Sequence, residues 1–138
     1  MARRVYFAFD YQDVFAVNQI RRAGQFVDVA VAGFTDASQW EKLKLKQDAV
    51  IKKAIDDALV RTSVTVVCVG ARTASRRWVK YELEASRYRG NGLLGVYLPG
   101  QAGHPKPKVL QDEGAPLYAW NSQRFATWVE SAAVKAGR

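Results

Sequence analysis

Two side chains that could act together in chemistry stand four residues apart, at Trp78 and Glu82. They lie in a segment bounded by Ser75, a typical helix N-cap, and by Gly90, typical of the position just after a helix. On a helix, residues four apart share one face, so the indole and the carboxylate would be neighbours. This helix follows the most apolar strand candidate, residues 64–69. The sequence therefore predicts a carboxylate beside an indole near the end of a buried strand.

The rest of the chain alternates between strands and helices. Apolar, β-branched and aromatic runs predict strands over residues 5–9, 26–31, 64–69, 93–98 and 117–120. Helical spacing predicts helices over residues 14–22, 38–59, 75–89 and from 122 onward. For the second of these, a break near residues 47–48 is an alternative. Residues 99–116, rich in Gly, Pro and Lys, are expected to form an exposed loop. This alternation predicts an α/β fold in one domain of residues 1–138, a flavodoxin-like doubly wound parallel five-stranded sheet of order 2-1-3-4-5.

Several polar residues have a structural explanation as helix caps. Asp13 and Ser122 precede the first and last predicted helices, and Ser38 with Glu41 matches a capping box. For Ser38, capping is favoured over substrate contact. The apolar stripe expected on the first helix consists of Val14, Phe15, Val17 and Ile20.

Charge and composition restrict the class of partner. The formal net charge is +8, but basic and acidic residues are interleaved, as in residues 41–48. This argues against a dedicated nucleic-acid surface and favours an anionic small ligand or an acidic partner. No apolar run approaches the ~20 residues that span a bilayer, and the start lacks the apolar region of a signal peptide. We expect a cytoplasmic protein that does not enter a membrane.

The single cysteine and the single histidine offer little chemistry. Cys68 falls in the middle of a predicted strand, where a small buried hydrophobe is expected. His104 lies in the Pro-rich loop, far in sequence from any nucleophile candidate. Neither a metal site nor histidine-dependent catalysis is predicted.

In a doubly wound sheet, ligands bind beyond the carboxyl ends of the strands, near the change in strand order. Here three loops meet there: residues 9–13, 33–38 and 70–75. The acidic first loop would repel a flavin phosphate, which disfavours a flavodoxin. A phosphoacceptor receiver needs an aspartate at the end of the third strand, and residues 69–72 contain none. No phosphate loop ending in Gly-Lys-Ser/Thr is present either.

Residues 78–82 match the W-x-x-x-E pattern that TIR domains carry on the helix after the third strand. More closely, the chain resembles the TIR-like proteins of bacterial Thoeris antiphage systems. The resemblance covers residues 3 to about 98, fades after Pro99, and rests on blocks that occur in the same order: RVYFAFDYQDV (4–14), FTDASQWE (34–41), TSVTVVCVG (62–70), RWVKYE (77–82) and GNG (90–92).

This resemblance implies an enzyme that cleaves the bond between nicotinamide and ribose in NAD⁺. It further implies a cyclic ADP-ribose-type product that activates a partner effector protein. NAD⁺ is then the substrate and no separate cofactor is expected. Enzymes of this family often need a trigger or self-assembly, so a homo-oligomer is one of the expected states.

Glu82 is the residue expected to be catalytic, because a fixed carboxylate stabilises the positive charge that develops on the ribose. Trp78 has two equally good interpretations, as a wall of the pocket and as core packing. Arg72, Arg76 and Arg77 flank the site and would offset the diphosphate charge. The expected substrate-binding residues are Phe9, Asp10, Asp36, Ser38, Arg77 and Trp78.

Two alternatives stay open at this point. A plain NAD⁺ hydrolase would share these residues, because hydrolysis and cyclisation differ in pocket shape and water access. A non-enzymatic TIR interaction module would also fit the small size, the aromatic residues expected on the surface and the basic charge.

Overall fold

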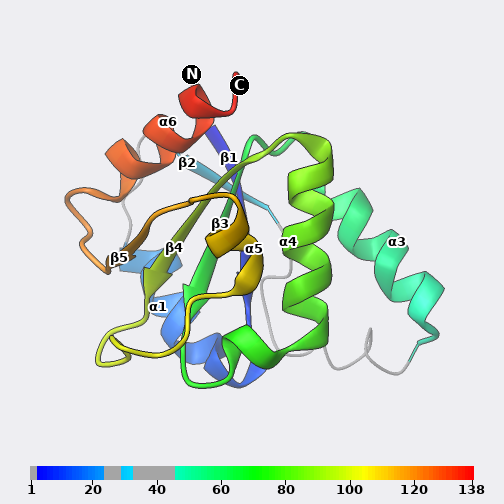
Figure 1. Cartoon of the computed structure of the whole chain (residues 1–138), viewed down its shortest axis with the longest axis horizontal. Coiled ribbons are helices and arrows are strands. Elements are labelled where there is room, and N and C mark those ends of the chain that lie inside the picture. Colours follow the sequence, from blue (N-terminus) through cyan, green and yellow to red (C-terminus); the bar gives the residue numbers. More distant parts are fainter. Residues whose placement is uncertain (1–2, 24–28, 33–45) are drawn as a thin grey trace.

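The computed structural model describes residues 3–23, 29–32 and 46–138. Within these residues, five parallel strands form one sheet of order β2-β1-β3-β4-β5. The predicted fold class and strand order are therefore confirmed (Figure 1). The change of direction in this order falls between β1 and β3, so the loops after these two strands lie side by side.

The strands lie close to their predicted positions. The third strand is buried at every position, as expected for a β-branched run that is covered on both faces. Cys68 is fully buried within it, as predicted. The strands are β1 (Arg3–Phe9), β2 (Val29–Ala32), β3 (Val64–Val69), β4 (Gly92–Tyr97) and β5 (Leu117–Ala119).

Helices cover both faces of this sheet (Figure 1). One buried apolar cluster joins the sheet to α1 and α6, and a second joins it to α3, α4 and α5. Because side chains alternate along a strand, Val5 and Phe7 of β1 enter the first cluster while Tyr6 and Ala8 enter the second. The helices are α1 (Val14–Ala23), α3 (Asp48–Leu59), α4 (Arg77–Arg89), α5 (Lys108–Asp112) and α6 (Phe125–Lys135).

The two ends of α4 differ in how well the sequence predicted them. Gly90 follows the helix with φ of 80°, the left-handed conformation that glycine adopts without strain. The predicted cap at Ser75 is wrong, because Ser75 belongs to a short 3₁₀ turn, η2 (Thr73–Ser75), and its hydroxyl donates to the Arg72 carbonyl at 2.9 Å. Arg76, in an extended conformation, takes the N-cap position of α4.

The first and last helices also correct the sequence-based expectations. Phe15 is 81% exposed, because it lies about 100° around α1 from Val14 and outside the stripe of buried residues. Ser122 does not cap α6: the helix begins at Phe125, after a turn in which the Asn121 side chain accepts a bond from the Gln123 N–H at 2.9 Å. A short side chain two residues from a backbone donor favours this turn over an earlier helix start.

Residues 99–116 are not wholly an exposed loop. They contain the short helix α5, whose Val109 and Leu110 are buried against the face of the sheet that carries α4. The burial of these two adjacent apolar residues stabilises α5. The Gly and Pro content of the segment had predicted a loop instead.

The predicted start of the second long helix falls outside the described residues, together with Ser38, Glu41 and the loop 33–38. From Asp48 onward α3 is present, with Ile51, Ile55 and Leu59 buried on one face at helical spacing. In the part of the chain that the structure describes, no helix is long and apolar enough to cross a membrane.

Candidate active site

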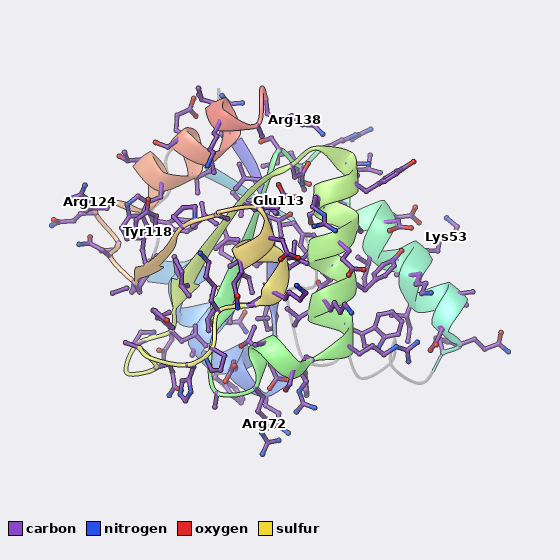
Figure 2. The ribbon with its side chains drawn as sticks, in the orientation of Figure 1. Lys53, Arg72, Glu113, Tyr118, Arg124 and Arg138 are labelled. Atoms are coloured by element: carbon purple, nitrogen blue, oxygen red, sulfur yellow. The ribbon has the colours of Figure 1, made fainter. Side chains whose placement is uncertain are left out.

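The loop between β3 and α4 forms one side of the candidate site. The Thr73 side chain organises this loop from a fully buried position: its Oγ1 accepts a bond from the Gly70 N–H at 2.8 Å. The chain then passes through η2, and α4 starts at Arg77 on the carboxyl side of the sheet. Arg72 projects outward from this edge (Figure 2). Local hydrogen bonds thus fix where α4 starts.

Glu82 lies on the inner face of α4 and is only 7% exposed. The Tyr6 hydroxyl, on a fully buried side chain of β1, donates a hydrogen bond to Glu82 Oε2. The residues around this pair are mainly apolar, since Tyr6 belongs to the cluster that also contains Val79 and Leu83 of α4. A carboxylate in such surroundings has strong electrostatic effects on any charge placed near it, because the local dielectric constant is low.

Trp78 stands one turn before Glu82 on the same helix. Its ring is half-buried against the α3–α4 cluster and meets Tyr81 edge-on, with ring centroids 5.9 Å apart. The Arg77 guanidinium lies over the indole, 4.6 Å from the ring centre. The observed contacts are therefore packing contacts, and a role as a pocket wall stays a prediction.

The contacts of Arg77 in the structure are with α3 and with Trp78, and its predicted role in substrate binding stays a prediction. Its exposed side chain forms an ion pair with Asp48 at the start of α3. The neighbouring Arg76 makes a different contact: its Nε donates to Asp10 Oδ1 at 3.1 Å. Asp10, immediately after β1, is nearly fully buried, whereas the Arg76 side chain is 40% exposed. This pair connects the first loop to the start of α4.

Phe9 does not share a face of the sheet with Glu82. It is half-buried and packs against the cluster formed with α1 and α6, because residues 5, 7 and 9 of β1 point to that face. The structure therefore brings Tyr6 to Glu82 and Asp10 to Arg76, while Phe9 and Arg77 contact other parts of the chain. The remaining predicted contacts, Asp36 and Ser38, lie outside the described residues.

The carboxyl group of Asp13 lies in surroundings that disfavour its charged form. Its carboxyl group packs over Gly70, where an added Cβ would lie 2.4 Å from Asp13 Oδ2. Within the described residues Oδ2 has no hydrogen-bond partner. Burial, followed by the nearby Asp10 carboxylate, raises the pKa of Asp13, and His104, Arg72 and Arg76 oppose this effect.

Sequence reasoning did not assign a role to Tyr6. The available signal was a tyrosine within a buried strand, because a buried phenol normally requires a hydrogen-bond partner. The identity of that partner could not be read from the sequence, since Glu82 is 76 residues away. Among the described residues, no group of three His, Cys, Asp or Glu side chains is placed to hold a metal ion.

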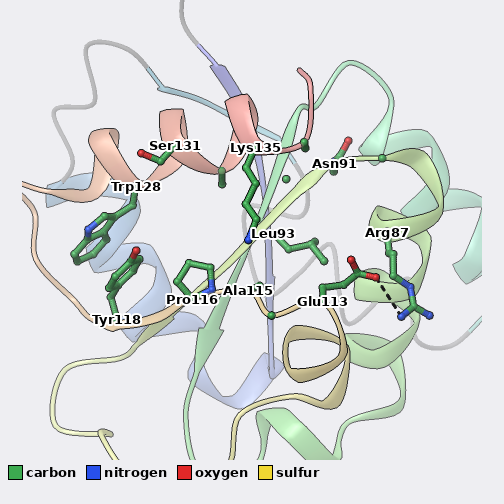
Figure 3. A pocket seen from close by; sticks show the side chains of 15 residues that line it. Arg87, Asn91, Leu93, Glu113, Ala115, Pro116, Tyr118, Trp128, Ser131 and Lys135 are labelled. Carbon is green, nitrogen blue, oxygen red and sulfur yellow. Dashed lines mark ion pairs between the residues drawn. The ribbon is translucent and has the colours of Figure 1, made fainter.

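A separate cleft of about 560 Å³ lies at the opposite, amino edge of the sheet. It runs from the stacked rings of Tyr118 and Trp128, past Lys135, to the ion pair of Arg87 and Glu113 (Figure 3). None of the described residues predicted for the site lines this cleft. The candidate site is therefore assigned from the Glu82 region and not from this hollow.

Comparisons with known proteins agree with this fold. The family model described as "Thoeris protein ThsB, TIR-like domain" matches residues 6–103. A protein of Bacillus cereus (strain MSX-D12), named "Putative cyclic ADP-D-ribose synthase ThsB1", is 43% identical over 101 residues. This alignment covers 71% of the chain and 53% of the relative, so the match spans about half the length of that protein. Glu82, Tyr6, Asp10 and Arg76 all lie within the matched residues.

Proposed function

The chain belongs to the family of the Thoeris ThsB TIR-like domain, and on that premise we propose that it is an NAD⁺-processing enzyme of antiphage defence. It cleaves the nicotinamide–ribose bond and closes the ADP-ribosyl unit into a cyclic ADP-ribose-type product. This product activates an effector protein of the same defence system. The name of the Bacillus cereus relative, "Putative cyclic ADP-D-ribose synthase ThsB1", supports the cyclising form of this reaction.

The observation that carries the proposal is the buried carboxylate of Glu82 on α4, which accepts a hydrogen bond from Tyr6 of β1. When the bond from ribose C1′ to the nicotinamide nitrogen breaks, its electron pair leaves with nicotinamide, and positive charge remains on the ribose. A fixed carboxylate nearby stabilises this oxocarbenium-like transition state, and its effect is largest where water is excluded. Nicotinamide leaves as a neutral molecule, so no strong acid is required.

The second half of the reaction forms a bond from C1′ to a nucleophilic atom of the same ADP-ribosyl unit. If water attacks instead, the product is linear ADP-ribose. Exclusion of water therefore decides between cyclase and hydrolase. Trp78, one turn from Glu82, contributes to this exclusion as a wall of the site.

Charged groups at the carboxyl edge suit the remainder of NAD⁺. Arg72 and Arg76 supply positive charge near the start of α4, which is appropriate for the diphosphate. Asp10, whose carboxylate accepts a bond from Arg76, is proposed for ribose or base contacts. Asp36 is proposed for contacts of the same kind, whereas for Ser38 a helix cap remains the favoured role. No cofactor other than the substrate is invoked.

The test is product analysis after incubation with NAD⁺, by chromatography and mass spectrometry. Wild type should release nicotinamide and an ADP-ribose isomer, and Glu82→Gln should lower the rate about 10²- to 10³-fold, the usual effect of removing one electrostatic stabiliser. Glu84→Gln is a matched control, since Glu84 is an exposed carboxylate two residues further along α4. It should retain the wild-type rate.

Undiminished activity in Glu82→Gln would refute the role of this residue. Absence of nicotinamide under triggered or assembled conditions would refute the enzymatic proposal as a whole. A linear product alone would establish the hydrolase. Full antiphage protection by Glu82→Gln would instead establish a TIR module that works through contacts with other proteins.

A further inference from the structure

Glu82 is attached to the sheet at two points, and both lie on the same pair of neighbouring strand residues. Tyr6 of β1 and Thr65 of β3 are partners in the parallel register. The Tyr6 hydroxyl donates to the Glu82 carboxylate. The Thr65 hydroxyl is hydrogen-bonded to the Ser86 hydroxyl at 2.7 Å, and Ser86 Oγ donates to the Glu82 backbone carbonyl at 2.6 Å. The paired residues Tyr6 and Thr65 thus restrain both the side chain and the backbone of Glu82.

The two attachments are rigid because their supports are rigid. β1 pairs with β2 on one side and with β3 on the other, so Tyr6 lies on a central strand of the sheet. The side chains of Tyr6, Thr65 and Ser86 are all fully buried. A buried phenol within a packed cluster has one rotamer, and its hydroxyl therefore stays in one place.

The two attachments have different chemical effects. The bond through Ser86 reaches only the backbone of Glu82, so it positions α4 against β3. The bond from Tyr6 reaches the carboxylate itself, and a hydrogen bond from a neutral O–H group is stronger when its acceptor is ionised. It fixes the plane of the carboxylate and favours its charged form inside an apolar cluster.

We propose that Tyr6 is a positioning residue that orients the Glu82 carboxylate and keeps it charged, an inference that rests on the proposed function of Glu82. Tyr6 acts through Glu82 and not through the substrate, because its side chain is fully covered. Preorganisation of this kind matters for catalysis, since a carboxylate that must reorient during the reaction stabilises the transition state less.

Steady-state kinetics of Tyr6→Phe, with NAD⁺ as substrate, test the proposal. The variant should lower kcat by a factor of about 10 to 100 and leave KM within about twofold, because a charge-assisted bond is lost without loss of a substrate contact. The acidic limb of its kcat–pH profile should move to higher pH, since the carboxylate retains a proton more readily without its donor.

Tyr97→Phe is the matched control. It also removes a tyrosine hydroxyl bond on the same face of the sheet, but that bond runs from Tyr97 of β4 to the His104 carbonyl at 3.2 Å and does not reach Glu82. It should leave both kcat and the acidic limb unchanged. A Tyr6→Phe enzyme with the wild-type pH profile, or with a loss confined to KM, would overturn the positioning role.

A second measurement does not depend on turnover. Chemical unfolding of Tyr6→Phe, Glu82→Leu and the double variant gives the coupling between the two side chains. The unfolding equilibrium constants should depart from additivity about tenfold or more, as expected for a hydrogen bond to a charged group. Additive effects would overturn the proposed bond, while coupling in a protein that leaves NAD⁺ intact would overturn only the proposed function.

Discussion

Gly92, the first residue of β4, provides a sharp test of how α6 packs on the sheet. A Cβ added there would lie 2.3 Å from the Ala132 carbonyl oxygen and 2.6 Å from its carbon. Both atoms belong to the backbone of α6, which cannot move aside as a side chain can. An ordinary contact begins near 3.4 Å, so Gly92→Ala must displace the helix by roughly 1 Å.

This displacement has a calculable cost. A gap of that size removes a quarter to a half of the dispersion energy of each contact, and Phe125, Val129 and Ala133 of α6 all lose contacts with the sheet. Overpacking usually costs 1–3 kcal/mol, and the rigid backbone places Gly92→Ala at about 3 kcal/mol. For a chain of this length, the expected fall in Tm is about 10 °C.

Thermal and urea unfolding of Gly92→Ala and of Gly95→Ala measure this difference. At Gly95 the nearest atoms are the terminal methyl carbons of Leu117 and Leu110, at 2.8 and 2.9 Å, which can rotate away. Gly95→Ala should therefore cost only about 1 kcal/mol. Equal costs for the two variants, or less than 1 kcal/mol for Gly92→Ala, would refute the packing argument.

Two further predictions concern the loops at the carboxyl edge. Because burial and Asp10 raise the pKa of Asp13, the stability that its protonation contributes is present below about pH 3.9 and lost as pH rises through the raised value. Asp13→Asn should thus exceed wild type in Tm at pH 7 but not below pH 4, and a pH-independent difference would contradict this. Thr73→Val should lower the free energy of unfolding in urea by about 1–3 kcal/mol, because the Gly70 N–H loses its partner. Thr73→Ser keeps a hydroxyl and should cost less. Equal costs for the two variants would contradict the role of this hydrogen bond.

The elements of the fold could be predicted because their signals are local. A continuous β-branched run predicted β3, and a glycine after the last helical turn predicted the end of α4 at Gly90. The order of the strands also followed, since parallel strands joined by helices permit few arrangements. Short-range choices between similar turns were less predictable. The 3₁₀ turn at Ser75 and the short helix α5 depend on the rest of the fold. It decides which backbone groups still need a hydrogen-bond partner and which apolar surface still has to be buried.

The composition of the candidate site was predictable only in part. The spacing of Trp78 and Glu82 placed both on one helix, and the resemblance to TIR-like proteins singled out Glu82. Only the tertiary structure decided that Tyr6 donates to Glu82 and that Arg76, rather than Arg77, holds Asp10. These contacts join residues that are 66 or more positions apart. They depend on the position and rotation of α4 on the sheet, and the packing of the whole apolar cluster sets both.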